Sequence, residues 1–209
     1  MATATESSTW NDWVLRTGTE DDADTAALLH AEQIGEGFLT FLGPAFLRRL
    51  YRRIARAPGS FLLIVEDGAT TVGILAGSTD VAALYRAFLW HDGPTVALTC
   101  SGRLLRSWRR VIETLRHGTG SAGQGAELLA IAVDPATRGR GAGTLLVEAF
   151  FSEIRRRGQN TAHVVVAAGN ESAVNLYRRA GFAVVDRFEL HAGTESYFMQ
   201  WVTEPGTNP

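Results

Sequence analysis

VDPATRGRGAGT, residues 133–144, is the stretch that decides the fold, because an apolar run precedes it and an amphipathic helical pattern follows it. The apolar run, residues 128–133, predicts a strand that leads into a Gly-rich turn. Glycine lets a backbone approach a ligand closely, and the first turn of a helix offers unpaired N–H groups to an anion. The stretch therefore predicts a cradle for a pyrophosphate, and so a nucleotide-like ligand.

Two other classes of phosphate-binding loop fit this stretch poorly. A P-loop needs a Lys followed by Ser or Thr after its last Gly, whereas all 20 basic residues of this chain are Arg. A dinucleotide-binding fingerprint needs a third Gly where this chain has Thr144, and it needs an acidic residue about 20 positions further on. Nucleotide hydrolysis and dinucleotide binding are therefore both disfavoured.

A second motif, NESAVNLYRRAGF, follows at residues 170–182. It resembles the N-x-x-A-x-x-L-Y-x-x-x-G-F motif of the GNAT superfamily of N-acetyltransferases. The first stretch, RGRGAG at residues 138–143 after a V-x-P turn, is similar to the phosphate-binding motif of the same family. The resemblance is strong over residues 127–198 and only topological over the first half of the chain.

This resemblance implies an α/β (α+β) GNAT fold. Such a fold has a mixed central sheet of about six to seven strands flanked by helices, here with a helical insertion between the third and fourth strands. The local patterns agree. They predict strands near 13–16, 61–65, 71–76, 128–133, 162–167, 182–188 and 196–202, and helices beginning at 19–22, after Pro44, over 142–157 and over 170–180.

The pattern of the helix over 142–157 predicts which side chains face the sheet. Arginines in its last turn and Gly158 after it are typical of a helix end. The predicted inward face consists of Ala142, Leu145, Leu146, Ala149, Phe150 and Ile154.

An insertion at 79–125 is the main departure from the plainest family members. Residues 103–117 place apolar side chains on one helical face and arginines on the other, which predicts an accessory helix. Its basic face is either simply solvated, or part of a lid or wall of the acceptor site, or a dimer surface.

Composition predicts one domain, residues 10–203, between flexible tails at 1–9 and 204–209. The 209 residues are 45% hydrophobic and 20% charged, enough for a single core. A net charge of -2 gives no basic field for nucleic acid or a membrane surface. No apolar run approaches the 18 or so residues that span a bilayer, and the single Cys100 fits a reducing compartment. We therefore expect a soluble cytoplasmic protein.

Acyl transfer to an amine needs a neutral amine, a polarised carbonyl and a proton for the departing thiolate. The resemblance implies that Tyr177 is the general acid, although a tyrosine here could also merely pack against the cofactor. It implies that Glu127 is the general base, as in histone-type members. The alternatives are an ordinary strand-end Glu127 and a relay through water. The apolar run 164–166 disfavours the ribosomal-protein branch, which carries a glutamate there.

The resemblance also implies the contacts of acetyl-CoA, the expected co-substrate. Backbone groups of the fourth strand would pair with the pantetheine arm and polarise the carbonyl, and the Gly-rich loop would enclose the pyrophosphate. Asn170 is expected to cap its helix, and a contact with the pantetheine arm is compatible with that role. The expected cofactor-binding residues are Ile131, Ala132, Val133, Arg138, Gly139, Arg140, Gly141, Ala142, Gly143, Thr144, Asn170, Ala173 and Tyr177.

The acceptor is expected to be a small-molecule amine, amino acid or amino sugar, acetylated directly in a ternary complex. The alternatives are a protein or peptide N-acetyltransferase, a longer acyl donor, and a regulatory module that binds coenzyme A without turnover. Residues 38–42, Tyr85, Trp90 and Trp108 are candidate walls of the acceptor pocket. The scattered histidines predict no metal site. Exposed apolar area on the insertion or the last strand would suit a homodimer, so the oligomeric state stays open.

Overall fold

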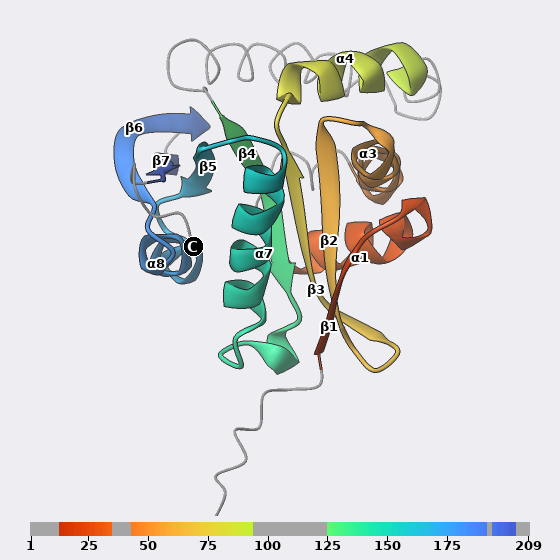
Figure 1. The fold of residues 1–209 in the computed structure, drawn as a ribbon, viewed down its shortest axis with the longest axis horizontal. Helices are drawn as coiled ribbons and strands as arrows, with labels where there is room; N and C mark the ends of the chain where they lie inside the picture. Colours follow the sequence, from red (N-terminus) through yellow and green to blue (C-terminus); the bar gives the residue numbers. More distant parts are fainter. Residues whose placement is uncertain (1–12, 35–42, 94–124, 192–193, 204–209) are drawn as a thin grey trace, which may run out of the picture.

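The computed structural model describes residues 13–34, 43–93, 125–191 and 194–203, which form seven strands and five α-helices (Figure 1). Helix α1 is preceded by a short 3-10 turn, η1 (Glu20–Asp22), and a second such turn, η2 (Pro135–Thr137), follows β4. The elements are β1 (Trp13–Thr17), α1 (Ala23–Gln33), α3 (Pro44–Arg56), β2 (Ser60–Asp67), β3 (Thr70–Ser78), α4 (Val81–His91), β4 (Ala126–Val133), α7 (Ala142–Arg156), β5 (Thr161–Ala167), α8 (Glu171–Arg179), β6 (Ala183–His191) and β7 (Thr194–Val202).

The strands form one mixed sheet in the order β1-β2-β3-β4-β5-β7-β6. All neighbours are antiparallel except β4 and β5, which are parallel. This arrangement confirms the fold class that the sequence predicts, and all of the strands expected from the sequence are present.

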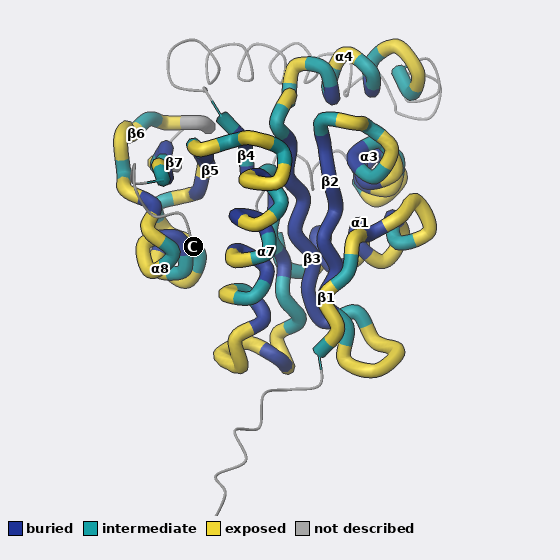
Figure 2. Tube along the Cα trace, viewed as in Figure 1, coloured by how far each residue is buried: buried dark blue, intermediate teal, exposed yellow. Residues whose placement is uncertain are grey.

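Helices cover both faces of the sheet, as the burial pattern in Figure 2 shows. Along β2, Phe61, Leu63 and Val65 belong to the cluster packed under α7 and α8. Leu62 and Ile64 belong to the cluster under α1, α3 and α4. This alternation follows from the two-residue period of a strand. The central strands are therefore apolar on both sides.

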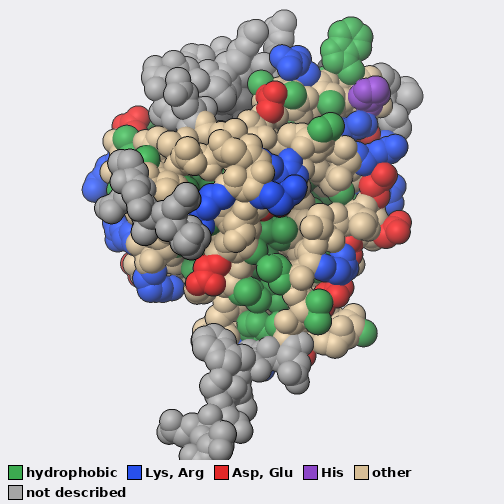
Figure 3. Space-filling view, in the orientation of Figure 1, with side chains coloured by type: hydrophobic (Ala, Val, Ile, Leu, Met, Phe, Trp, Pro, Cys, Tyr) green, Lys and Arg blue, Asp and Glu red, His purple; other side chains and the backbone are tan. Residues whose placement is uncertain are grey.

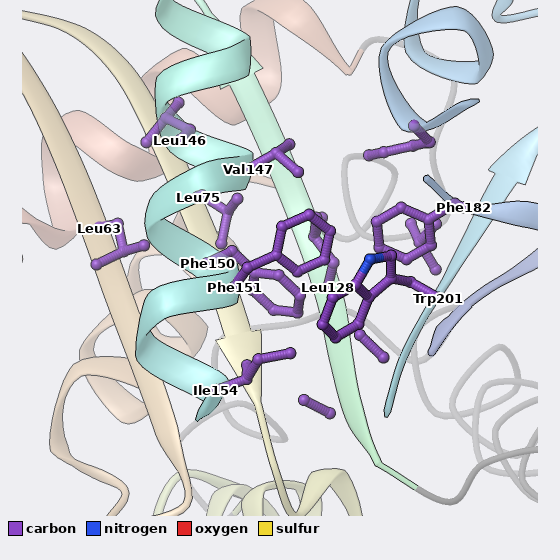
Figure 4. Packing of buried hydrophobic residues seen from close by; sticks show 14 of the residues in the cluster. Leu63, Leu75, Leu128, Leu146, Val147, Phe150, Phe151, Ile154, Phe182 and Trp201 are labelled. Carbon is purple, nitrogen blue, oxygen red and sulfur yellow. The ribbon is translucent and has the colours of Figure 1, made fainter. Parts of the chain in front are cut away.

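Helix α7 buries a wider face than its pattern predicts. Leu146, Phe150 and Ile154 are buried as expected, but Val147 and Phe151 are buried as well, while Leu145 and Ala149 are only half-buried. The reason is a second contact: Phe151 stacks on Trp201 of β7 with ring centroids 4.3 Å apart, so α7 packs against two parts of the sheet (Figure 4).

The insertion begins with α4, a helix that the sequence patterns did not predict. Asp80 caps it by accepting a hydrogen bond from the backbone N–H of Ala83 at 2.8 Å. Leu84 and Phe88 are buried against the α1/α3 side of the sheet, and Phe88 packs edge-on against Phe46 of α3. The helix predicted at 103–117 lies outside the described residues, as do the two predicted tails.

The pairing of β4 is irregular on both of its edges. On the β3 side, Ala76 pairs with Ala130 and Gly77 pairs with Leu128, so Leu129 is an extra residue that forms a bulge. On the β5 side, only two rungs exist, Ala126 with Ala162 and Glu127 with His163. Beyond Glu127 the two parallel strands separate, and a gap opens within the sheet.

Candidate active site

The Gly-rich loop joins β4 to α7 through η2. Gly139 and Gly141 have φ angles of +77° and +102°, in the left-handed region that favours glycine. A Cβ atom built on either residue would meet nothing within 4 Å. These two glycines therefore turn the chain and leave the space above the loop free.

The first turn of α7 presents unpaired N–H groups. Gly141 is the N-cap and provides no side-chain cap. Its carbonyl oxygen accepts the first helical hydrogen bond, from the N–H of Leu145 at 2.9 Å. The N–H groups of Ala142, Gly143 and Thr144 precede that bond, so they have no helical acceptor and are donors for an anion.

A cavity of about 430 Å³ lies over this turn and extends into the gap between β4 and the start of α8. Four parts of the chain line it: the C-terminal end of α1, the end of β4, the Gly-rich loop with the first turn of α7, and α8 with its N-cap. Its lining comprises Gln33, Ile34, Ile131, Ala132, Val133, Thr137, Arg138, Gly139, Gly141, Ala142, Gly143, Thr144, Asn170, Ser172, Ala173, Leu176 and Arg179.

Most of the expected cofactor-binding residues line this cavity, and two do not. The guanidinium of Arg140 lies over the Trp13 ring, 5.4 Å from the centroid. The side chain of Tyr177 is on the buried face of α8 and belongs to the core. Asn170 does cap α8, because its side-chain oxygen accepts from the N–H of Ala173 at 3.1 Å.

Six lining residues were missed by the sequence analysis, namely Gln33, Ile34, Thr137, Ser172, Leu176 and Arg179. Leu176 and Arg179 follow Ala173 at helical spacing on the same face, so the second motif contained the signal for them. Gln33 had no such signal, since it comes from α1 and reaches the site only in the folded chain. Its side-chain oxygen accepts a hydrogen bond from Arg138 at 2.5 Å.

Tyr177 is buried, with 4% of its surface exposed. Its ring packs edge-on against Phe182 with centroids 5.6 Å apart. Burial raises the pKa of the Tyr177 phenol, so the hydroxyl keeps its proton at neutral pH. That is the protonation state that a general acid requires.

Glu127 lies at the closed end of the gap, on the last rung that β4 shares with β5. One carboxylate oxygen, Oε2, is 3.3 Å from Nε2 of His163, directly opposite on β5. Tyr85 of α4 is a further neighbour: burial first, and the charge of Glu127 second, raise the pKa of its phenol. Glu127 does not line the cavity, and Ile131 lies about 13 Å further along the strand at roughly 3.3 Å per residue.

Among the other candidates for the acceptor pocket, the structure describes only Trp90. Trp90 is 81% exposed on α4, while residues 38–42 and Trp108 lie outside the described residues. In the described ranges, no cluster of three His, Cys, Asp or Glu side chains is arranged to hold a metal ion. No helix in that part of the chain has the length and apolar character to cross a bilayer.

Charged side chains of both signs are intermingled on the face shown in Figure 3. Ion pairs of the described residues include Arg53 with Asp92 at 2.8 Å and Arg157 with Glu153 at 2.7 Å. This mixture agrees with the small net charge of the chain, -2.

Comparison with known proteins identifies relatives that are similar in sequence. A mycothiol acetyltransferase of Mycobacteroides abscessus is 29% identical over 188 residues, covering 79% of this chain and 63% of the relative. One from Nocardia farcinica is 32% identical over 168 residues, 68% of this chain and 55% of the relative. The chain thus spans less than two thirds of these proteins.

Solved structures share the fold. The structure of yncA from Salmonella typhimurium, with its cofactor acetyl-CoA, superposes with a TM-score of 0.56 at 15% identity, over 95% of this chain and 98% of that one. The family described as "Acetyltransferase (GNAT) family" matches residues 29–182. The chain therefore belongs to the GNAT family of acetyltransferases.

Proposed function

We propose that the chain transfers an acetyl group from acetyl-CoA to the primary amine of a small molecule, directly within a ternary complex. The observation that carries the proposal is the cavity over the N-terminus of α7, because it joins an anion cradle to a gap in the sheet. A pyrophosphate suits the free N–H groups of the first turn, with Arg138 and Arg179 on the cavity lining. The gap leaves one edge of β4 free to pair with the extended pantetheine arm of acetyl-CoA.

Two side chains outside the cavity lining are the candidates for the proton transfers. Glu127 would take the proton of the incoming ammonium group, so that the neutral nitrogen forms a bond to the thioester carbonyl carbon. Tyr177 would give its phenolic proton to the sulfur as the carbon–sulfur bond breaks, and the second proton that the nitrogen loses would return to the Tyr177 oxygen. Backbone N–H groups near the Leu129 bulge would donate to the carbonyl oxygen as negative charge develops there.

The relatives support a small-molecule acceptor. Both compared proteins are named mycothiol acetyltransferase, and Glu127 offers a carboxylate to a cationic amine. A protein or peptide acceptor, and a module that only binds coenzyme A, are the alternatives that an experiment has to separate.

Ligand-dependent thermal stability tests the cofactor. Acetyl-CoA at about 100 times its dissociation constant should stabilise the fold by about 2.7 kcal/mol. For a chain of this size, each kcal/mol corresponds to roughly 2–4 °C in the melting temperature. NAD at the same concentration serves as the control. A shift with acetyl-CoA and none with NAD supports the cradle, and no shift with any coenzyme A ester refutes it.

Thiol release then tests the transfer. Acetyl-CoA is incubated with glucosamine, an alkyl diamine, free amino acids, a peptide with a free N-terminus, and the acceptor of the mycothiol acetyltransferases. Acceleration by one of the small amines supports the proposal. Acceleration by the peptide alone supports the first alternative, and tight binding of acetyl-CoA without release in any mixture supports the second.

A further inference from the structure

The register of β4 and β5 brings the side chains of Glu127 and His163 into contact. These residues form the last rung between β4 and β5 before the strands separate. Paired residues on adjacent strands point to the same face. Ala126 and Ala162, which form the preceding rung, belong to the core under α7, so Glu127 and His163 point to the opposite face, where α4 brings Tyr85.

The imidazole of His163 is held firmly. Only 7% of the residue is exposed. Its ring stacks on Phe198 of β7, with centroids 5.3 Å apart and planes inclined by 22°. The register of β5 and β7 fixes both strands, because Ala162 pairs with Trp201 and Val164 with Met199. The ring therefore has little freedom to turn away from Glu127.

The surroundings of the ring decide which nitrogen carries the hydrogen. Nδ1 is buried and has no hydrogen-bond partner in the part of the chain that the structure describes. A proton on Nδ1 would thus be a donor without an acceptor, which is costly inside a protein. A proton on Nε2 has the Glu127 carboxylate 3.3 Å away. The favoured tautomer donates from Nε2 to Oε2.

That hydrogen bond leaves the other oxygen of Glu127 for the substrate. Among the described residues, Oε1 has no hydrogen-bond partner, and 19% of the Glu127 side chain is exposed. We propose that His163 is a positioning residue, which holds Oε2 of Glu127 so that Oε1 meets the amine of the acceptor. This inference rests on the proposed function, because it assumes that Glu127 receives the amine proton.

Two substitutions separate donation from packing. His163→Phe keeps an aromatic ring for Phe198 to stack on but removes the donor, whereas His163→Gln places an amide N–H close to the position of Nε2. A misplaced catalytic group costs up to about 100-fold in rate. We expect kcat to fall about 10- to 100-fold in His163→Phe, with KM for acetyl-CoA unchanged, and to recover to within about threefold of wild type in His163→Gln. His91→Gln on the exposed end of α4 is the matched control.

Three results would overturn the inference. The first is a His163→Phe enzyme that keeps kcat within about twofold of wild type, and the second is a folded His163→Gln enzyme as impaired as His163→Phe. The third comes from the 15N NMR spectrum of the imidazole at neutral pH, which needs no turnover. We expect a hydrogen on Nε2, with a resonance that moves in Glu127→Gln, and an imidazole whose only hydrogen is on Nδ1 would refute the donation.

The NMR spectrum also separates this inference from the proposed function. If the wild-type protein acetylates none of the amines, the proposed function fails, while the spectrum still decides whether His163 donates to Glu127. If the amines are acetylated and Glu127→Gln retains full kcat, the function stands, but Glu127 is not the base and the positioning role of His163 is refuted.

Discussion

The buried histidine of α1 makes the stability of the fold depend on pH. His30 is 3% exposed; its Nδ1 lies 2.8 Å from the hydroxyl of Tyr51 in α3. Nε2 is buried without a partner among the described residues. Protonation would place a charge and an unsatisfied N–H in this apolar contact, and burial accordingly lowers the pKa of His30 from 6.5 to about 4.

The sign and size of the effect follow from linkage. Between pH 6.5 and about pH 4 the unfolded chain binds a proton at His30 and the folded chain does not. The free energy of unfolding therefore falls as the pH falls through this window. Each pH unit is worth about 1.4 kcal/mol, so we expect His30 to cost the fold on the order of 3 kcal/mol by pH 4.

Urea unfolding followed by tryptophan fluorescence, at pH 7 and at pH 4.5, measures this loss. His30→Gln can still bond to Tyr51 but does not titrate, so its loss between the two pH values should be smaller than that of wild type by about 2 to 3 kcal/mol. His91→Gln removes an exposed histidine and should behave as wild type. Carboxylates titrate alike in all three proteins and cancel in the comparison. Equal losses in His30→Gln and wild type would refute the reasoning.

Three further substitutions test the cradle, the acid and the core. In Gly141→Trp, an indole would fill the open space above the loop, so the thermal shift with coenzyme A should disappear; a shift as large as in wild type would contradict the cradle. In Tyr177→Phe, turnover measured where chemistry limits the rate should fall about 100-fold with acetyl-CoA affinity unchanged, and an unchanged kcat would remove Tyr177 as the acid. Phe150 is 0% exposed, so Phe150→Ala should lower the free energy of unfolding by about 3–5 kcal/mol in urea. The exposed control Glu148→Ala should change it by less than about 0.5 kcal/mol, and similar losses in both would argue against the packing in Figure 4.

The sequence predicted the elements whose patterns are local. The strand into the Gly-rich loop, the helix after it and the cap at Asn170 each depend on neighbouring residues, and each is present in the structure. Strand β4 begins at Ala126 rather than Leu128, which places Glu127 inside the strand. Helix α4 was missed because its residues 81–91 are apolar on most sides, although Asp80 before them is a typical N-cap.

What the sequence could not supply was long-range placement. The burial of Phe151 depends on Trp201, fifty positions away on a strand whose neighbours only the folded sheet defines. Gln33 reaches the cavity because α1 ends beside the Gly-rich loop. His163 was noted only as one scattered histidine, since its contact with Glu127 requires the register of two strands separated by a helix.

The gap between β4 and β5 has a consequence for how the molecule deforms. Only two rungs of backbone hydrogen bonds join the strands there, so the width of the gap is set by side chains acting as spacers. One such side-chain contact is the stack of Phe151 on Trp201, which packs α7 against the β5/β7 half of the sheet beside the closed end, where Trp201 pairs with Ala162 and Ala162 with Ala126. Hydrogen bonds have a fixed length, but an aromatic spacer can be exchanged for a thinner or a thicker one. The width of the gap between β4 and β5 thus depends on side-chain volume. It can be changed by substitutions that leave the Gly-rich loop, the Glu127 carboxylate and the Tyr177 phenol untouched.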